Sequence, residues 1–147
     1  MTRQRVSSGA PWESRFGYSR AVRVGRQVFV AGTTAVGPDG VVIGRGDPHR
    51  QTLEALRIIE RALADAGGTM EDVVRTRMFV TDISRAEEYG RAHGEFFGSA
   101  RPAATMVEVP RLIDPDMMVE VEVDALLPPR RTGRASGARR WPPAESL

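Results

Sequence analysis

The chain of 147 residues contains no cysteine and no lysine. The absence of cysteine excludes disulfides, zinc–thiolate sites and thiol nucleophiles. The absence of lysine excludes a Schiff-base nucleophile and a phosphate-binding loop that ends in Gly-Lys. The only two histidines, His49 and His93, are far apart in the sequence. A zinc site is therefore not predicted.

Long apolar runs are also missing. No stretch approaches the ~20 apolar residues that a membrane helix needs. The basic segment 1–8 is not followed by the apolar stretch of a signal peptide. We therefore expect a cytoplasmic protein, and its length fits one domain.

Charge is distributed unevenly along the chain. Residues 1–127 contain 16 arginines and 18 acidic residues, whereas residues 128–147 contain five arginines and one acidic residue. The pI of 9.9 therefore owes much to the last 20 residues. These residues are rich in Pro, Gly and Arg without periodicity, so we predict a folded domain over 1–127 and a disordered basic tail over 128–147. Because the folded part is slightly acidic, nucleic acid is not an expected partner.

Helical and strand patterns follow one another along residues 22–127. Apolar residues at helical spacing predict helices over 47–66 and 84–97, with Asp47 and Ser84 as N-caps. Segments rich in strand-forming residues predict two strands within 22–32, a short one at 41–43, and further strands at 73–80, 103–109 and 117–127.

This order predicts an α+β fold, with a mixed β-sheet and both long helices on one face. In the last strand, valines alternate with Glu120, Glu122 and Asp124, so one face is apolar and the other is acidic. The sheet face without helices must be polar or covered. An oligomer that packs sheet faces or edges around an axis would cover it.

Short segments in this order resemble the Rid (YjgF-like) family. They extend over residues 16–126 and include Gly17-Tyr18, Val28-Phe-Val-Ala-Gly32, Asp72-Val-Val-Arg-Thr76, Arg101-Pro-Ala103, Val107-Glu-Val109 and Val119-Glu-Val-Glu122. The resemblance implies a chorismate-mutase-like fold, a homotrimer and small-molecule sites in the three clefts between subunits, with no cofactor and no metal. Founding members hydrolyse reactive enamines and imines to keto acids and ammonia, and some relatives are described as ribonucleases.

Three polar positions of the family are lost here. The deaminases have an arginine after Pro-Ala that pairs with the substrate carboxylate, a role that suits a bidentate guanidinium. This chain has Ala104 there. It also has Ala31 in place of a common serine, and Gly90 in place of an asparagine in the second long helix.

Other family positions are retained, namely Tyr18, Gly32, Thr105 and Glu120. The resemblance implies that the glutamate positions or activates the attacking water. A carboxylate beside a bound water can act as a general base. Glu122 is the alternative, because one extra residue in the preceding turn would shift the alignment. Glu120 could equally be a solvated residue or one that forms an ion pair across subunits.

Four further side chains are candidates. His93 could act as an acid or base near neutral pH, or be a helix-surface or interface histidine. Trp12 could form a wall of an aromatic cleft with Tyr18, or pack the N-terminus down. Arg77 or Arg20 could supply the missing cation from another direction.

Three functions follow from this reading. The first is a divergent Rid-type enzyme of hydrolase or deaminase type that binds a small enamine, imine or carbonyl metabolite, with reduced activity on the usual 2-imino acids. The second is a non-catalytic small-molecule-binding or partner protein. The third is RNA binding or cleavage through the basic tail, which would depend steeply on salt.

Overall fold

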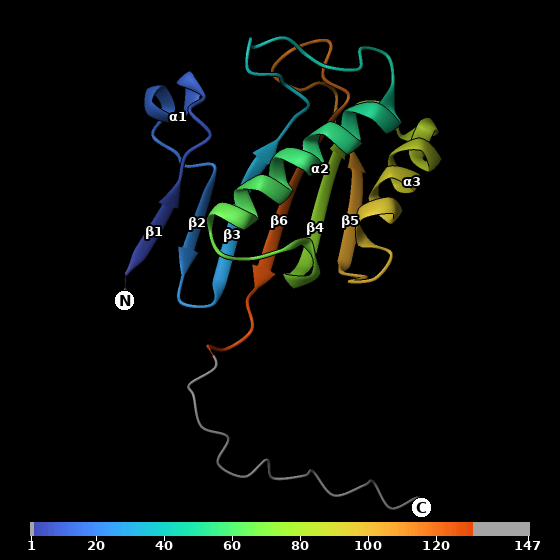
Figure 1. Ribbon diagram of the computed structural model, residues 1–147. Helices are drawn as coiled ribbons and strands as arrows, with labels where there is room; N and C mark the ends of the chain where they lie inside the picture. Colours follow the sequence, from blue (N-terminus) through green and yellow to red (C-terminus); the bar gives the residue numbers. More distant parts are fainter. Residues whose placement is uncertain (1, 131–147) are drawn as a thin grey trace, which may run out of the picture.

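The computed structural model describes residues 2–130. Most of the tail predicted for 128–147 therefore lies outside the described residues. The structure is a six-stranded sheet covered by helices on one face (Figure 1). Across the sheet the strands are β1 (Arg3–Val6), β2 (Ala21–Val24), β3 (Gln27–Thr33), β6 (Val119–Leu126), β4 (Val73–Val80) and β5 (Ala103–Glu108).

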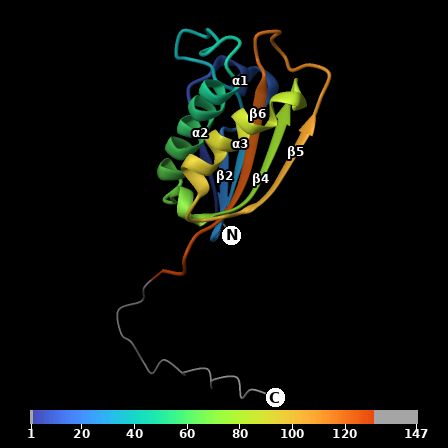
Figure 2. The same ribbon diagram turned by 90° about the vertical axis from the view of Figure 1, so that its right-hand side faces the viewer.

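The sheet is mixed. β4 and β5 are parallel, and every other neighbouring pair is antiparallel. Because β3 and β4 both run antiparallel to β6, they are parallel to each other. The helices α2 (Pro48–Asp65) and α3 (Ala86–Phe97) connect β3 to β4 and β4 to β5. Figure 2 shows both helices on the same side of the sheet. The predicted α+β fold class is confirmed.

The side chains of strand β6 alternate between the two faces of the sheet. Val119, Val121 and Val123 are fully buried under the helices, whereas Glu120, Glu122 and Asp124 alternate with them and are half-buried. The apolar side packs against α2, where Leu56, Ile59 and Leu63 are also fully buried. Burial of each such side chain contributes about 1.5–3 kcal/mol. The side without helices, called the open face below, therefore carries the acidic residues.

Helix α2 begins as predicted. The Asp47 carboxylate accepts a hydrogen bond from the Arg50 backbone N–H at 3.0 Å. The buried Gln51 side chain donates to the carbonyls of Gly44 and Asp116 and accepts from the Met118 N–H. It thereby joins the two loops that lie side by side at the top of Figure 1.

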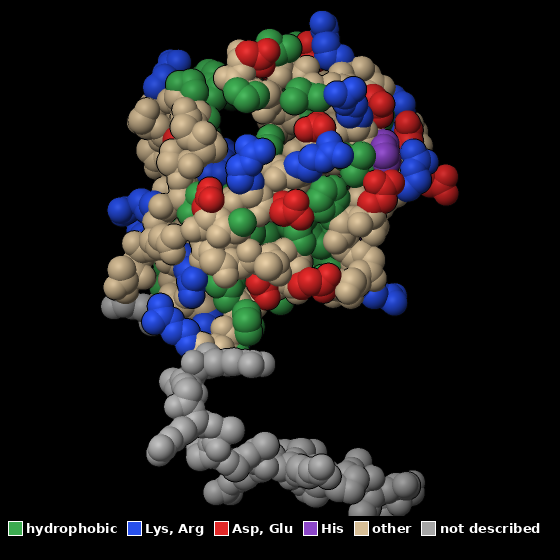
Figure 3. Space-filling model, in the orientation of Figure 1, with side chains coloured by type: hydrophobic (Ala, Val, Ile, Leu, Met, Phe, Trp, Pro, Cys, Tyr) green, Lys and Arg blue, Asp and Glu red, His purple; other side chains and the backbone are tan. Residues whose placement is uncertain are grey.

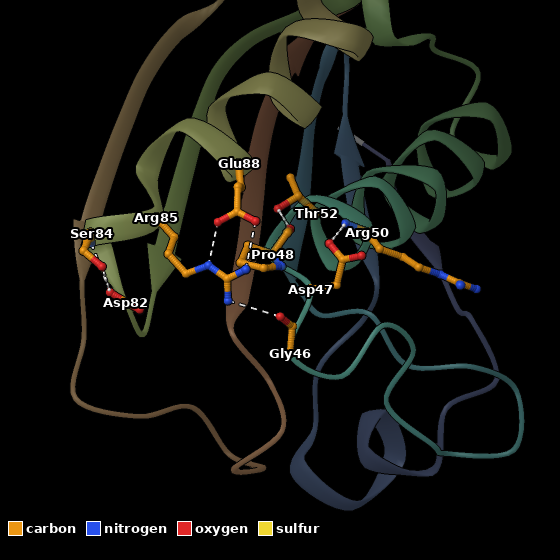
Figure 4. A network of polar contacts seen from close by, with 9 residues as sticks. All are labelled: Gly46, Asp47, Pro48, Arg50, Thr52, Asp82, Ser84, Arg85 and Glu88. Atoms are coloured by element: carbon orange, nitrogen blue, oxygen red, sulfur yellow. Dashed lines mark hydrogen bonds and ion pairs between the residues drawn. The ribbon is translucent and has the colours of Figure 1, made fainter.

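The predicted start of α3 is wrong. Residues Ile83–Arg85 form a separate 3₁₀ turn, and Asp82 rather than Ser84 caps it by accepting from the Ser84 N–H. Arg85 then bonds to Glu88 and to the Gly46 carbonyl, as Figure 4 shows. An aspartate is as good a cap as a serine, and it stands two residues earlier. This network links the beginnings of α2 and α3.

The two N-terminal elements were not predicted. Strand β1 extends the sheet beyond β2, and the short helix α1 (Pro11–Phe16) ends at Gly17, whose φ of 75° is left-handed. The strand predicted at 41–43 is reduced to a single bridge between Val36 and Val42. In the described part of the chain, no helix has the length and apolar character needed to span a membrane.

Candidate functional site

A bulge in β3 forms the centre of the candidate site. Val30 pairs with Val123 and Thr33 pairs with Val121, so Ala31 and Gly32 together face the single residue between them on β6. The Glu120 carboxylate lies against Gly32, since a Cβ added there would be 2.7 Å from Glu120 Oε1. Glycine at this position therefore lets the carboxylate approach the backbone.

Arg20 supports the other side of Gly32. Its side chain is buried, with 8% of the residue exposed. Nη1 donates to the Gly32 carbonyl at 2.8 Å and to Thr33 Oγ1 at 2.9 Å. Nη2 lies 3.5 Å from the Tyr18 hydroxyl, and the guanidinium stands 5.6 Å from the centre of the Tyr18 ring. Gly32 is thus held between a carboxylate and a guanidinium.

The environment changes the proton affinity of Glu120. Burial raises the pKa of its carboxyl, the positive charge of Arg20 opposes that rise, and the negative charge of Glu122 adds to it. The net direction is upward. A carboxyl with a raised pKa exchanges protons more readily near neutral pH, as a general acid or base requires.

The N-terminal segment is fixed by a buried carboxylate. Glu13 on α1 is 6% exposed and accepts hydrogen bonds from the Ser8 backbone N–H and hydroxyl. Burial alone would raise the pKa of Glu13, but the hydrogen bonds from Ser8 and Ser7 and the charge of Arg20 lower it below its usual value. Glu13 therefore stays ionised and ties α1 to the segment after β1.

Arg77 is already paired. It lies on the open face, and Nη1 is 3.3 Å from both Glu122 Oε1 and Asp124 Oδ2. Two carboxylates share its charge, so Arg77 offers a ligand anion little net attraction. Arg20 is bonded to the protein backbone. Neither of the two arginines predicted as substitutes for the missing cation stands free.

Positions 104 and 105 face opposite sides of the sheet. Thr105 pairs with Arg77 on β4 and shares the open face, whereas Ala104 pairs with Thr76, which is buried toward α3. Within one chain, Ala104 therefore lies on the helix side, and Glu120 lies against Gly32 on the open side. The structure of a single chain does not bring Ala104 and Glu120 into one cleft.

His93 belongs to the helix side as well. Its Nε2 lies 2.8 Å from Thr76 Oγ1, and its ring packs against Phe97 at 4.6 Å between centroids. Burial lowers the pKa of the imidazole, so the neutral form predominates at pH 7. His93 is thus next to the Ala104 position and separate from Glu120.

A groove of about 520 Å³ lies on the open face beside the bulge. Tyr18 lines it, but Trp12 does not: Trp12 stacks on Phe16 and is 45% exposed. Sequence reasoning missed Arg3 and Arg5, which also line the groove. Only Val6 of the four residues of β1 is apolar and buried, so the sequence offers little signal for this strand. Within residues 2–130, no group of three His, Asp or Glu residues is arranged to hold a metal ion.

Comparisons with known proteins agree with this fold. Residues 9–127 match the family model described as Endoribonuclease L-PSP. A Streptomyces coelicolor protein is 44% identical over 122 residues, covering 83% of this chain and 90% of its own. A RutC family protein of Pyrococcus abyssi is 34% identical, covering 74% and 84%.

The chain belongs to this family, which includes the YjgF or Rid proteins. A crystal structure of a YjgF/YER057c/UK114 family member from Mycobacterium tuberculosis is 52% identical, with a TM-score of 0.78 over 86% of this chain and all of the other. The Rid resemblance inferred from short segments is confirmed.

Within this Rid-family chain, the predicted residues fall into two groups. Tyr18, Gly32 and Glu120 lie close together around the bulge and are connected through Arg20. Ala104 and His93 lie together near α3. Thr105 on β5 and Arg77 on β4 lie side by side on the open face.

Proposed function

We propose that this Rid-family chain hydrolyses small enamines, imines or related carbonyl compounds, with Glu120 as the proton carrier. One observation carries the proposal: a half-buried carboxyl with a raised pKa lies against the Gly32 backbone. Glu120 and Gly32 do not themselves line the groove, but Ala31 next to Gly32 lines it together with Tyr18. The groove volume of about 520 Å³ suits a small metabolite.

The chemistry needs one water and one proton carrier. An enamine first takes a proton at its β-carbon and so becomes the protonated imine. Glu120 takes a proton from water as the oxygen adds to the carbon of the protonated imine and the C=N electron pair moves to nitrogen, which gives a carbinolamine. Glu120 then returns that proton to the nitrogen, and as the C–N bond breaks and the C=O bond forms, the hydroxyl proton passes to Glu120. The products are a carbonyl compound and ammonia. Glu120 suits both steps because burial favours its protonated form while the charge of Arg20 favours the carboxylate.

A second subunit completes the cleft in this proposal. Ala104 and His93 face away from Glu120 within one chain, so a shared cleft requires residues from two chains. The open face also exposes apolar side chains, including Phe29 and Val107. A homotrimer with clefts between subunits fits both features. Light scattering that gives the mass of a monomer at micromolar concentration would contradict this arrangement.

Residue 104 sets the expected substrate range. An arginine there would bind a carboxylate next to the reacting carbon, and alanine has no hydrogen-bond donor in its side chain. A lost charge-assisted hydrogen bond typically costs about 1.5–3 kcal/mol. We therefore expect low activity on 2-imino acids such as 2-iminopropionate. Turnover of 2-iminopropionate at the rate of an arginine-containing deaminase would contradict this.

Ammonia release provides the test of catalysis. Imines generated in situ by an amino acid oxidase or an amine oxidase are supplied to the wild type, to Glu120→Gln and to Glu122→Gln. Glu120→Gln is expected to lose about 10²-fold or more of the rate, as for removal of a general base, and Glu122→Gln only a few-fold. Equal rates for Glu120→Gln and the wild type would favour the non-catalytic binding protein instead.

Ribonuclease chemistry is the weaker reading of the family description. On the open face, the acidic residues Glu122 and Asp124 pair with Arg77, and Glu120 adds a further carboxyl, so the centre of this face is not a basic surface for a phosphate backbone. On the helix side, acidic and basic side chains are interspersed rather than gathered into a basic patch (Figure 3). Small-molecule hydrolysis therefore fits the described surface better.

A further inference from the structure

The groove on the open face has ends of opposite charge. Arg3 and Arg5 of β1 lie at one end, and Glu122 and Asp124 of β6 lie at the other. Phe29, which is 45% exposed, lies between them. The pairing register explains this row, because Arg5 pairs with Val22, Val22 with Phe29 and Phe29 with Asp124. Paired residues project to the same face of a sheet.

The acidic end is partly neutralised and the basic end is not. Arg77 lies 3.3 Å from both Glu122 and Asp124, so part of their charge is compensated. Arg3 and Arg5 are exposed and form no ion pair with another residue among 2–130. An anionic ligand in the groove therefore meets its strongest attraction at β1.

We propose that Arg3 and Arg5 bind the acidic group of the ligand, and that the substrates carry this group several atoms away from the carbon that is hydrolysed. The second part rests on the proposed function, because Glu120 marks the reacting carbon. In this proposal the arginines of β1 bind the acidic group that an arginine at position 104 would bind, and they do so from a different side of the ligand.

The geometry of the sheet sets the distance between the arginines of β1 and Glu120 on β6. Three strand spacings divide β1 from β6, roughly 14 Å in all. Glu120 lies a further four residues, about 14 Å, along β6 from Asp124, the residue in register with Arg5, on the same face. An extended arginine side chain covers part of this distance. A carboxylate attached directly to the reacting carbon cannot reach both ends, whereas one on a chain or ring of several atoms can.

Binding is tested first, without any reaction. The probes are 4-phenylbutyrate and its uncharged amide, measured by calorimetry and by NMR on the assembled protein. The acid is expected to bind the wild type more tightly than the amide does, and Arg3→Gln/Arg5→Gln is expected to weaken the acid about tenfold or more with little change for the amide. Arg61→Gln, an exposed arginine of α2, serves as the matched control. Equal affinity for acid and amide, or no loss in the double variant, would overturn the proposal.

Turnover separates this inference from the proposed function. An imine with a distal carboxylate should react faster than 2-iminopropionate in the wild type, and this advantage should disappear in Arg3→Gln/Arg5→Gln. If acids bind in a way that depends on the arginines but no imine is turned over, the hydrolase proposal is contradicted and the arginine proposal stands. If turnover depends on Glu120 but does not change when both arginines are replaced, the arginine proposal is contradicted and the hydrolase proposal stands.

Discussion

Two parts of the sheet differ in how their polar groups are held. Around β2, β3 and the start of β6, Arg20 is buried and hydrogen-bonded to Gly32 and Thr33. Around β4, α3 and β5, exposed small residues predominate over buried charges: a Cβ added at Gly90 or Gly94 would meet no atom within 4 Å. We call these the polar wall and the small-residue wall. In the proposed function, the polar wall provides the chemistry and the small-residue wall of a neighbouring subunit provides space.

The difference shows what a buried charge requires. Arg20 remains buried because carbonyl and hydroxyl oxygens accept its hydrogen bonds, and Glu13 because serine donors satisfy it. A buried charge without such partners is costly. On the small-residue wall, the pair Thr76–His93 forms a half-buried contact between two uncharged side chains. Substitutions on the two walls should therefore have different consequences.

The largest difference in hydrolytic activity is expected between the variants Gly32→Ala and Gly90→Ala. A methyl group at Gly32 would displace the Glu120 carboxylate, so we expect a loss of about 10²-fold in hydrolysis, as for removal of a general base. Because that carboxylate ends a flexible side chain, the melting temperature should change little. Gly90→Ala should retain activity and stabilise α3 by about 0.5–1 kcal/mol. Similar activity in the two variants would remove the distinction between the walls.

Arg20→Gln tests the support of the polar wall. Removing the guanidinium leaves the Gly32 carbonyl and the Thr33 hydroxyl without their charged donor. We expect a loss of about 1.5–3 kcal/mol in the free energy of unfolding, measured by urea titration. Arg77→Gln, which removes a more exposed cation on the same sheet, should cost about 1 kcal/mol or less. The reverse order would show that Arg20 supports little.

Thr76→Val probes the one strong contact of the small-residue wall. Valine keeps the shape of threonine but removes the oxygen that contacts His93 Nε2. The loss in unfolding free energy should be about 1 kcal/mol, the net value of one hydrogen bond. A second measurement with His93→Phe in both backgrounds gives the coupling between the two side chains. No coupling would mean that the contact does not stabilise the fold.

The smallest expected effect is the contribution of His93 to the pH dependence of stability. Burial lowers the pKa of His93 in the folded chain below the ordinary value of about 6.5. The unfolded chain therefore binds this proton more tightly, and stability falls as the pH drops below about 6.5 toward the folded-state value. The urea midpoint should fall less steeply over this range in His93→Gln than in the wild type. Identical slopes would contradict the assignment.

The sequence predicted well the elements with strong periodicity. The alternation of valine and acidic residues in β6 and the spacing of leucine and isoleucine in α2 gave the two faces of the sheet and its helical cover. The same alternation placed Glu120 and Glu122 on the open face. Local patterns are sufficient there because burial imposes them.

Other parts of the site depend on contacts between distant segments. No local pattern shows that Arg20 bonds to Gly32 or that Arg77 pairs with Glu122 and Asp124. Strand β1 has only four residues, three of them exposed, so its pattern is weak. Ser84 was predicted as a cap because Asp82 and Ser84 are both good N-cap residues; Asp82 caps the 3₁₀ turn before α3, and α3 itself has no side-chain cap.

The proton affinity of Glu120 is the most direct test of the account. Carbon-13 labelling of the glutamate carboxyls allows the titration of Glu120 to be followed by NMR, with Glu120→Gln to assign the signal. We expect the pKa of Glu120 to lie above the ordinary glutamate value of about 4.3, because burial disfavours the carboxylate. It should rise further in Arg20→Gln, where the favourable charge is lost, and less in Arg20→Lys. A pKa of Glu120 at or below the ordinary value, unchanged by either substitution, would contradict its role as the proton carrier.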